Sequence, residues 1–182
     1  LMVVDMPHNT YRSKSSALKN AKKIIKETKC DAVKLEGGKK IIKQIKFLIK
    51  NKISVMGHLG LLPQTNKGKF KSKGGNNKEI KQLINESLLL QDCGVFSIVL
   101  ECVKTSLAKQ ITEKLKIPTI GIGSSSYCDG QVLVTDDLIG LNNTKIKFVK
   151  KFINIKKYIN LGLKKFSSEV KSKKYPLKKH SY

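Results

Sequence analysis

Short apolar runs alternate with longer amphipathic segments along most of the chain. The runs are brief and mostly rich in Val, Ile and Leu, as strands are: Leu1–Asp5, Ala32–Glu36, Ile53–Gly57, Val95–Glu101, Thr119–Gly121 and Gln131–Val134. The segments between and after them carry apolar residues at helical spacing: Ser16–Thr28, Lys40–Asn51, Glu79–Asp92, Ser106–Leu115 and, as one long or broken region, Ile146–Val170. The alternation predicts an α/β protein with a parallel sheet.

The number of strands leaves two architectures open. Six strands are fewer than a closed (β/α)8 barrel requires, whereas an open doubly wound sheet can use six but should carry a cofactor fingerprint in a βα turn. Gly121-Ile122-Gly123 gives only half of such a fingerprint. The 182 residues contain no repeat or composition break, so we expect a single domain over residues 1–182. The Gly-, Lys- and Asn-rich segment Gln64–Lys78 is expected to be a surface loop or a lid over a site.

The amino-acid composition limits the classes of partner that the protein is expected to bind. The net charge is +24, but Arg12 is the single Arg and there is no Trp, whereas readers of nucleic acids rely on Arg forks and interleaved aromatics. We therefore interpret the charge as a compositional by-product and expect no specific nucleic-acid partner. No apolar run approaches the roughly 18 residues of a membrane span, and the N-terminus reads as a strand rather than a secretory signal.

The four cysteines add little chemistry. Cys30, Cys93, Cys102 and Cys128 form no C-x-x-C pair, and most lie in or beside apolar runs. This pattern argues against a structural zinc site and favours buried, reduced thiols.

Ionisable residues stand at the carboxyl ends of the first four predicted strands. Asp5 ends the first, Lys34 and Glu36 the second, His58 follows the third and Glu101 ends the fourth. Sites in α/β folds are built at this edge, because the βα loops converge there. Lys34 and Glu36 are two residues apart in a strand and so point to one face, with Val33 and Leu35 on the other.

Each of these residues also has a structural interpretation. Asp5 could cap the turn at Pro7, Lys34 and Glu36 could form an exposed edge pair, and His58 could be a hydrogen-bonded structural imidazole. Glu101 ends a very apolar run, which makes it the best candidate for a general base. The hard oxygens of Asp5 and Glu36 would suit Mg²⁺, and Lys34 could neutralise a substrate carboxylate. Together these features predict chelation of a 2-oxo acid followed by proton removal next to its carbonyl.

At these segments the sequence resembles the ketopantoate hydroxymethyltransferase family. The matching stretches occur in the family's order: VVDMP at Val3–Pro7, AVKLEGG at Ala32–Gly38, VMGHLGLLPQ at Val55–Gln64, IVLECV at Ile98–Val103, IPTIGIGSS at Ile117–Ser125, CDGQVLV at Cys128–Val134 and HSY at His180–Tyr182. The resemblance implies a TIM (β/α)8 barrel of the phosphoenolpyruvate/pyruvate class. It also implies transfer of a hydroxymethyl group from 5,10-methylenetetrahydrofolate to 3-methyl-2-oxobutanoate, giving 2-dehydropantoate for pantothenate synthesis.

The resemblance also implies roles for individual residues. Asp5 would ligate Mg²⁺ and contact the substrate, Glu36 would complete the metal site, Lys34 would bind the substrate carboxylate and Glu101 would be the proton acceptor. His58 would line the site. The family further implies a cytoplasmic homo-oligomer, commonly a decamer.

The chain departs from the family pattern in several places. Leu62 replaces a small hydroxyl residue, Ser124–Ser126 replaces a Gly- and Pro-containing turn, and Lys67–Lys78 differs. The family's upstream segment, with a DSLG-type motif that supplies another Asp ligand and a Ser, has no counterpart here. We therefore expect a barrel truncated to about six βα units, equivalent to strands 3–8, which by itself would be poorly soluble and inactive. The alternatives are an Mg²⁺-dependent C–C lyase or mutase of the same barrel class, or an inactive truncated paralogue that binds through its basic surface.

Overall fold

The computed structural model describes residues 1–66, 71–143 and 145–182. The chain divides into two compact units, Leu1–Val132 and Leu133–Tyr182. The single domain expected over residues 1–182 stays a prediction.

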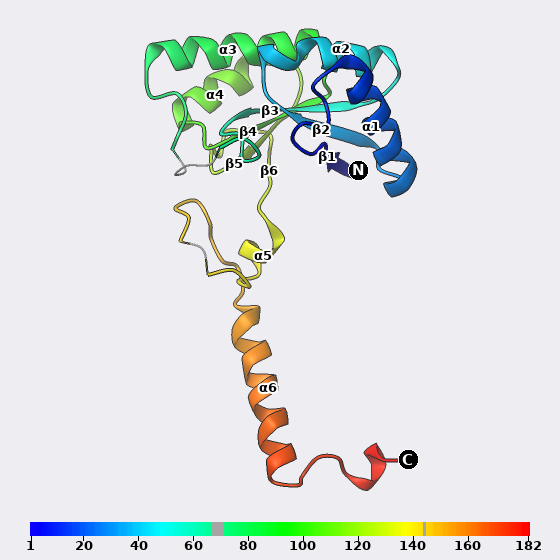
Figure 1. Ribbon diagram of the computed structural model, residues 1–182. Helices are drawn as coiled ribbons and strands as arrows, with labels where there is room; N and C mark the ends of the chain where they lie inside the picture. The colour runs from blue at the N-terminus through cyan, green and yellow to red at the C-terminus, as the bar shows by residue number, and fades with distance from the viewer. Residues whose placement is uncertain (67–70, 144) are drawn as a thin grey trace. The chain divides into compact units, whose positions relative to one another are not determined.

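The first unit is built on a parallel sheet of six strands that follow one another in chain order (Figure 1). The strands are β1 (Val3–Asp5), β2 (Ala32–Glu36), β3 (Val55–Gly60), β4 (Ser97–Glu101), β5 (Thr119–Ile122) and β6 (Gly130–Gln131). The connecting helices are α1 (Lys14–Thr28), the 3₁₀ turn η1 (Lys39–Ile41) with α2 (Ile42–Lys50), α3 (Asn77–Asp92) and α4 (Thr105–Lys114).

The strand order decides between the two architectures. Parallel crossovers are right-handed, so a sheet without a reversal of order carries all its helices on one face, as Figure 1 shows. A doubly wound sheet would reverse its order and have helices on both faces. The described residues thus form a parallel half-barrel, which confirms the α/β barrel class and the six units and excludes the doubly wound alternative.

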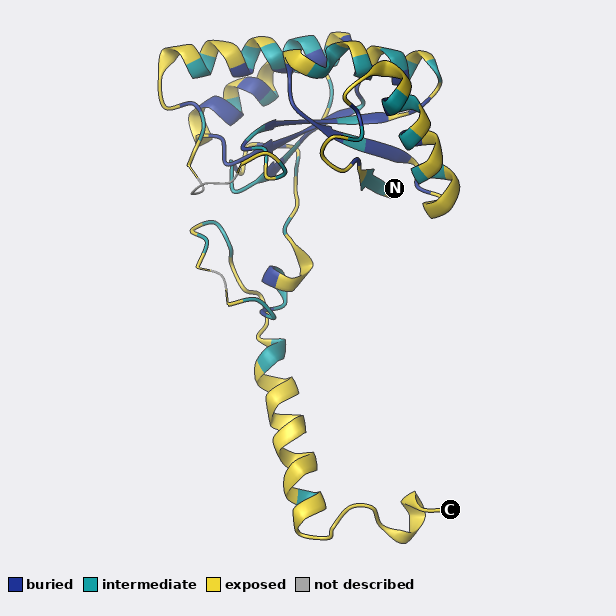
Figure 2. Ribbon diagram, in the orientation of Figure 1, coloured by how far each residue is buried: buried dark blue, intermediate teal, exposed yellow. Residues whose placement is uncertain are grey.

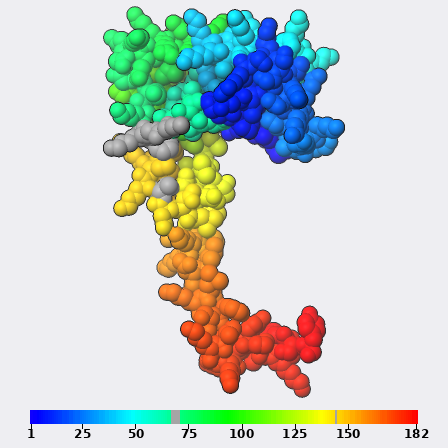
Figure 3. Space-filling model, in the orientation of Figure 1, coloured from blue at the N-terminus to red at the C-terminus, as the bar shows by residue number. Residues whose placement is uncertain are grey.

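The core lies between the sheet and the helices. Figure 2 shows the central strands mostly in the colour of buried residues. Val33, Leu35, Ile98 and Leu100 are fully buried in this core. Side chains on the other face alternate with them, as the strand period requires. Helix α1 packs against α2, which Figure 3 shows as adjoining dark-blue and lighter blue atoms. Since the apolar face points at the helices, the ionisable residues are left to the inner face of the half-barrel.

Five of the six predicted strands have different bounds in the structure, and the third and the last differ most. The third was expected at Ile53–Gly57 but extends to Gly60, because its pairing with β4 continues to Glu101. His58 therefore lies within a strand and not after it. The last was expected at Gln131–Val134 but comprises Gly130–Gln131, which pair with Ile120 and Gly121.

The end of the Gly-rich segment Gln64–Lys78 is hydrogen-bonded to helix α3 and to the residue that follows β4. Oε2 of Glu79 accepts hydrogen bonds from the backbone N–H groups of Gly74 (3.0 Å) and Gly75 (2.9 Å), and these bonds lower the pKa of Glu79. The N–H of Lys73 donates to the carbonyl of Cys102 at 2.7 Å. Because residues 67–70 of the Gln64–Lys78 segment lie outside the described residues, the choice between surface loop and lid stays a prediction.

The second unit contains α5 (Thr135–Leu138), α6 (Ile155–Lys171) and the 3₁₀ turn η2 (Lys178–His180). The helical region expected over Ile146–Val170 was placed too early, since its first described residues are not helical and α6 starts only where the side chain of Asn154 accepts from the N–H of Lys157. None of the residues of α6 is buried (Figure 2). Among the described residues, no helix has the length and apolar character to span a membrane.

Candidate active site

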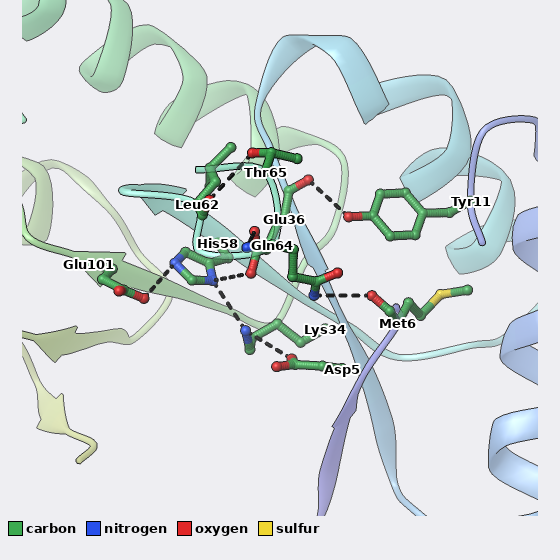
Figure 4. A network of polar contacts seen from close by, with 10 residues as sticks. All are labelled: Asp5, Met6, Tyr11, Lys34, Glu36, His58, Leu62, Gln64, Thr65 and Glu101. Atoms are coloured by element: carbon green, nitrogen blue, oxygen red, sulfur yellow. Dashed lines mark hydrogen bonds and ion pairs between the residues drawn. The ribbon is translucent and has the colours of Figure 1, made fainter. Parts of the chain in front are cut away.

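The register of the sheet places the predicted site residues on the inner face. Asp5 pairs with Lys34 across β1 and β2, and Glu36 pairs with His58 across β2 and β3. Glu101 pairs with Gly60 at the end of β3. Residues paired in parallel register share a face, so the carboxyl ends of four neighbouring strands bring these five side chains together (Figure 4).

Lys34 lies at the centre of a polar network. Its Nζ is 2.8 Å from Oδ1 of Asp5 and 3.1 Å from Nδ1 of His58. The Lys34 side chain is 17% exposed and that of Glu36 only 4%, so the two are not an exposed edge pair. Asp5 is 52% exposed and directs its carboxylate at Lys34, whereas the turn at Pro7 is closed by Thr10. These three side chains therefore lie together on the inner face, and their role in a site stays a prediction.

Glu36 is a buried carboxylate whose surroundings shift its pKa in both directions. Its Oε2 accepts a hydrogen bond of 3.1 Å from the backbone N–H of Gln64. Burial raises the pKa of Glu36 most strongly and the charge of Asp5 raises it further, while His58, the Gln64 N–H and Lys34 act in the opposite direction.

His58 and Glu101 form the second half of the network. His58 is buried in β3, and its Nε2 lies 3.4 Å from Oε2 of Glu101. The distance permits an ion pair, but the geometry does not meet that of a hydrogen bond. Glu101 itself is buried at the end of β4, as its apolar run predicted. Cys102 follows with φ 52°, which turns the chain away from the sheet directly after the carboxylate.

Two residues near the site were not among the predicted ones. Gln64 donates through its backbone to Glu36 and through its side-chain amide to the carbonyl of Met6 at 3.2 Å, so it links the ends of β1 and β2. The hydroxyl of Tyr11, which is buried, donates to the carbonyl of Glu36 at 3.4 Å, and burial is the main reason that the pKa of Tyr11 is raised. The motif ending in Gln64 was a usable signal for the first, whereas no pattern pointed to the second.

The donor set fits a magnesium ion better than a metal held in a protein cage. Among the described residues, no three His, Cys, Asp or Glu side chains are grouped so as to hold a metal. The site offers two carboxylates, Asp5 and Glu36, at neighbouring strand ends. Mg²⁺ characteristically takes one or two carboxylates and completes its octahedron with water and substrate. The four cysteines are buried and free.

Solved structures share the fold of this chain. A candidate phosphonomutase from Burkholderia cenocepacia J2315 superposes with a TM-score of 0.52 at 8% identity, over 93% of this chain and 70% of that one. An uncharacterized conserved protein from Geobacillus kaustophilus gives a TM-score of 0.51 at 11% identity, over 88% and 74%. At these identities the likeness concerns the α/β fold alone.

Sequence relatives define the family. The family model described as ketopantoate hydroxymethyltransferase matches residues 1–178. A 3-methyl-2-oxobutanoate hydroxymethyltransferase of Pelagibacter ubique (strain HTCC1062) is 65% identical over 182 residues, which are 100% of this chain and 70% of the relative. One of Clostridium botulinum (strain 657 / Type Ba4) is 46% identical over 186 residues, covering 100% and 68%. The chain belongs to the ketopantoate hydroxymethyltransferase family, whose members are transferases.

Proposed function

We propose that the protein transfers a hydroxymethyl group from 5,10-methylenetetrahydrofolate to 3-methyl-2-oxobutanoate, forming 2-dehydropantoate in pantothenate biosynthesis. The names of the relatives support the hydroxymethyl transfer. The observation that carries the mechanism is the placement of a cation, Lys34, and a buried carboxylate, Glu101, on either side of one histidine. We propose that the reaction takes place in the cytoplasm and within a homo-oligomer.

Lys34 binds the substrate carboxylate in this mechanism. The ammonium group has three N–H donors, and within the described residues two are directed at Asp5 and His58. The third is left for a 2-oxo acid. Because Lys34 is largely enclosed, a charge pair with the substrate would be poorly screened and correspondingly strong.

Glu101 takes the proton from C3 of the substrate. The C–H electron pair moves into the C2–C3 bond as the carbonyl becomes an enolate, and the proton passes to a carboxylate oxygen of Glu101. C3 then attacks the methylene carbon of the folate, and the bond from that carbon to one folate nitrogen breaks. Water displaces the second nitrogen and supplies the hydroxyl group, so tetrahydrofolate leaves with the proton from C3 and one proton from water. Asp5 and Glu36 would hold Mg²⁺, which when bound stabilises negative charge on the 2-oxo oxygen.

The test is exchange of the C3 proton with solvent deuterium, followed by proton NMR without folate. The protein should catalyse the exchange, and Glu101→Gln should abolish it, because an amide cannot accept the proton. Glu113→Gln is a matched control, since Glu113 lies on α4 and pairs with Lys109 of the same helix. Undiminished exchange in Glu101→Gln would remove Glu101 from the role. Folate-independent cleavage of the substrate would instead indicate a lyase.

A further inference from the structure

His58 is the most enclosed of the five side chains at the site and joins its two halves. Its side chain is 2% exposed. On one side of the ring, Nδ1 is 3.1 Å from Nζ of Lys34, and on the other, Nε2 is 3.4 Å from Oε2 of Glu101. The ring therefore separates the cation that would bind substrate from the carboxylate that would take its proton (Figure 4).

The contact with Lys34 determines the tautomer of this ring. An ammonium group can only donate hydrogen bonds, so Nδ1 of His58 accepts from Lys34 and carries no proton. A neutral ring in that state has its hydrogen on Nε2. Nδ1 then cannot also donate to Oε1 of Glu36, which lies 4.0 Å away and beyond hydrogen-bond reach. The one ring hydrogen is therefore on Nε2, the ring nitrogen that lies 3.4 Å from Oε2 of Glu101.

We infer that His58 is a positioning residue, fixed by Lys34 as the Nε2–H tautomer so that its ring hydrogen holds Oε2 of Glu101 and leaves Oε1 to receive the substrate proton. The inference rests on the proposed role of Glu101. Nε2 is a buried polar atom without a hydrogen bond among the described residues. A buried donor left unpaired is costly, and Glu101 is the charged acceptor within reach. In the proposed arrangement the carboxylate of Glu101 must therefore move into line with the Nε2–H group.

This arrangement explains why a histidine occupies the position. A histidine presents an acceptor and a donor on opposite sides of a rigid ring, which matches an ammonium group on one side and a carboxylate on the other. With Oε2 held, Glu101 can take up a proton on Oε1 without rotating. Productive geometry of this kind contributes strongly to rate, since small misplacements of a reacting group are expensive.

Three substitutions separate the two functions of the ring. His58→Gln retains an amide N–H near the place of Nε2 but loses the acceptor for Lys34, whereas His58→Asn retains an acceptor near Nδ1 but cannot reach Glu101. His58→Phe keeps the ring and loses both polar atoms. For each of the three variants, the rate of C3 deuterium exchange and the Kd for 3-methyl-2-oxobutanoate are measured.

The expected result is a split between rate and affinity. His58→Asn should lower the exchange rate about 10- to 100-fold, the range for losing one hydrogen bond to a charged group, with Kd changed by less than about threefold. His58→Gln should recover most of that rate and weaken binding. Equal losses in His58→Asn and His58→Gln, or full recovery by His58→Phe, would show that the ring only fills space and would overturn the inference.

A second measurement does not depend on activity. Long-range proton–nitrogen NMR of protein labelled in its 3 histidines reports which ring nitrogen carries the hydrogen, and His58→Asn identifies the signal. Protonation of Nε2 alone is expected, and this preference should weaken in Lys34→Met. A ring protonated at Nδ1 would overturn the inference. If the unaltered protein shows the expected tautomer but no exchange, the proposed function fails and the tautomer assignment stands.

Discussion

Replacement of Lys34 by Met separates the structural from the functional contribution of the network's central residue. Met keeps an unbranched apolar side chain of similar reach, so the packing of the lysine stem is largely preserved. The substitution removes the ion pair to Asp5 and the hydrogen bond to Nδ1 of His58. It also removes the positive charge next to the buried carboxylate of Glu36.

The expected loss of stability is modest. Asp5 is half exposed, so its ion pair contributes about 0–1 kcal/mol. Nδ1 of His58 becomes a buried acceptor without a partner, which costs about 1–3 kcal/mol. The free energy of unfolding should therefore fall by roughly 1–4 kcal/mol. Substrate binding should suffer more, because a substrate carboxylate held in the site without its partner costs about 2–5 kcal/mol, a rise in Kd of roughly 30- to 5,000-fold.

Urea unfolding and calorimetric titration with 3-methyl-2-oxobutanoate measure the two quantities on the same protein. Lys22→Met is the control, since Lys22 is exposed on α1 and should change neither. The reasoning is refuted if Lys34→Met loses stability as expected but binds the 2-oxo acid within about threefold of the unaltered protein. Lys34 would then only support its neighbours.

Three further predictions test the metal ligands, the strand end and the charge. Asp5→Asn should weaken Mg²⁺ binding about tenfold or more, because a neutral ligand replaces a charged one. Calorimetric titration with Mg²⁺ measures this, with Asp92→Asn as the control, and an unchanged affinity in Asp5→Asn would contradict the assignment. Gly60→Ala should lower the free energy of unfolding by about 2 kcal/mol or more, because the φ of Gly60 is +94° and a Cβ there would strike the carbonyl of Glu101. Gly162→Ala in α6 is the control, since its Cβ meets nothing within 4 Å and should not destabilise the protein. The +24 charge should not give sequence-selective binding to duplex DNA, so selective retention at about 0.2 M salt would oppose the compositional interpretation.

Much of the fold follows from local patterns. The strand Ala32–Glu36 was predicted with its observed bounds, because a short Val- and Leu-rich run with two polar residues at alternate positions has a clear period. The same period put Lys34 and Glu36 opposite Val33 and Leu35, and the structure confirms it, with Val33 and Leu35 fully buried. The helix expected over Ser16–Thr28 from its apolar spacing is observed as Lys14–Thr28, and its N-terminus is capped by Ser13 and Ser16.

Other features depend on contacts between distant segments. The end of β3 was placed at Gly57, because glycine and histidine interrupt an apolar run, yet pairing with β4 continues the strand to Gly60. The start of α6 was placed too early because apolar residues before Asn154 continue the helical spacing, although the chain there is not helical. There the backbone N–H of Phe152 instead donates to the carbonyl of Leu138. In both cases tertiary hydrogen bonds override the local pattern.

The network at the site is a property of register, which is why its members could be predicted and their connections could not. Strand ends bring ionisable residues to one edge whatever the register, but a shift of one residue would turn His58 to the opposite face. In the observed register His58 lies opposite Glu36 and Val99, with Glu101 one period further along β4. This offset lets the ring reach Lys34 with one nitrogen and Glu101 with the other. A lone histidine in a sequence gives no indication of two such partners, so its connecting role emerges only when the pairing of three strands is known.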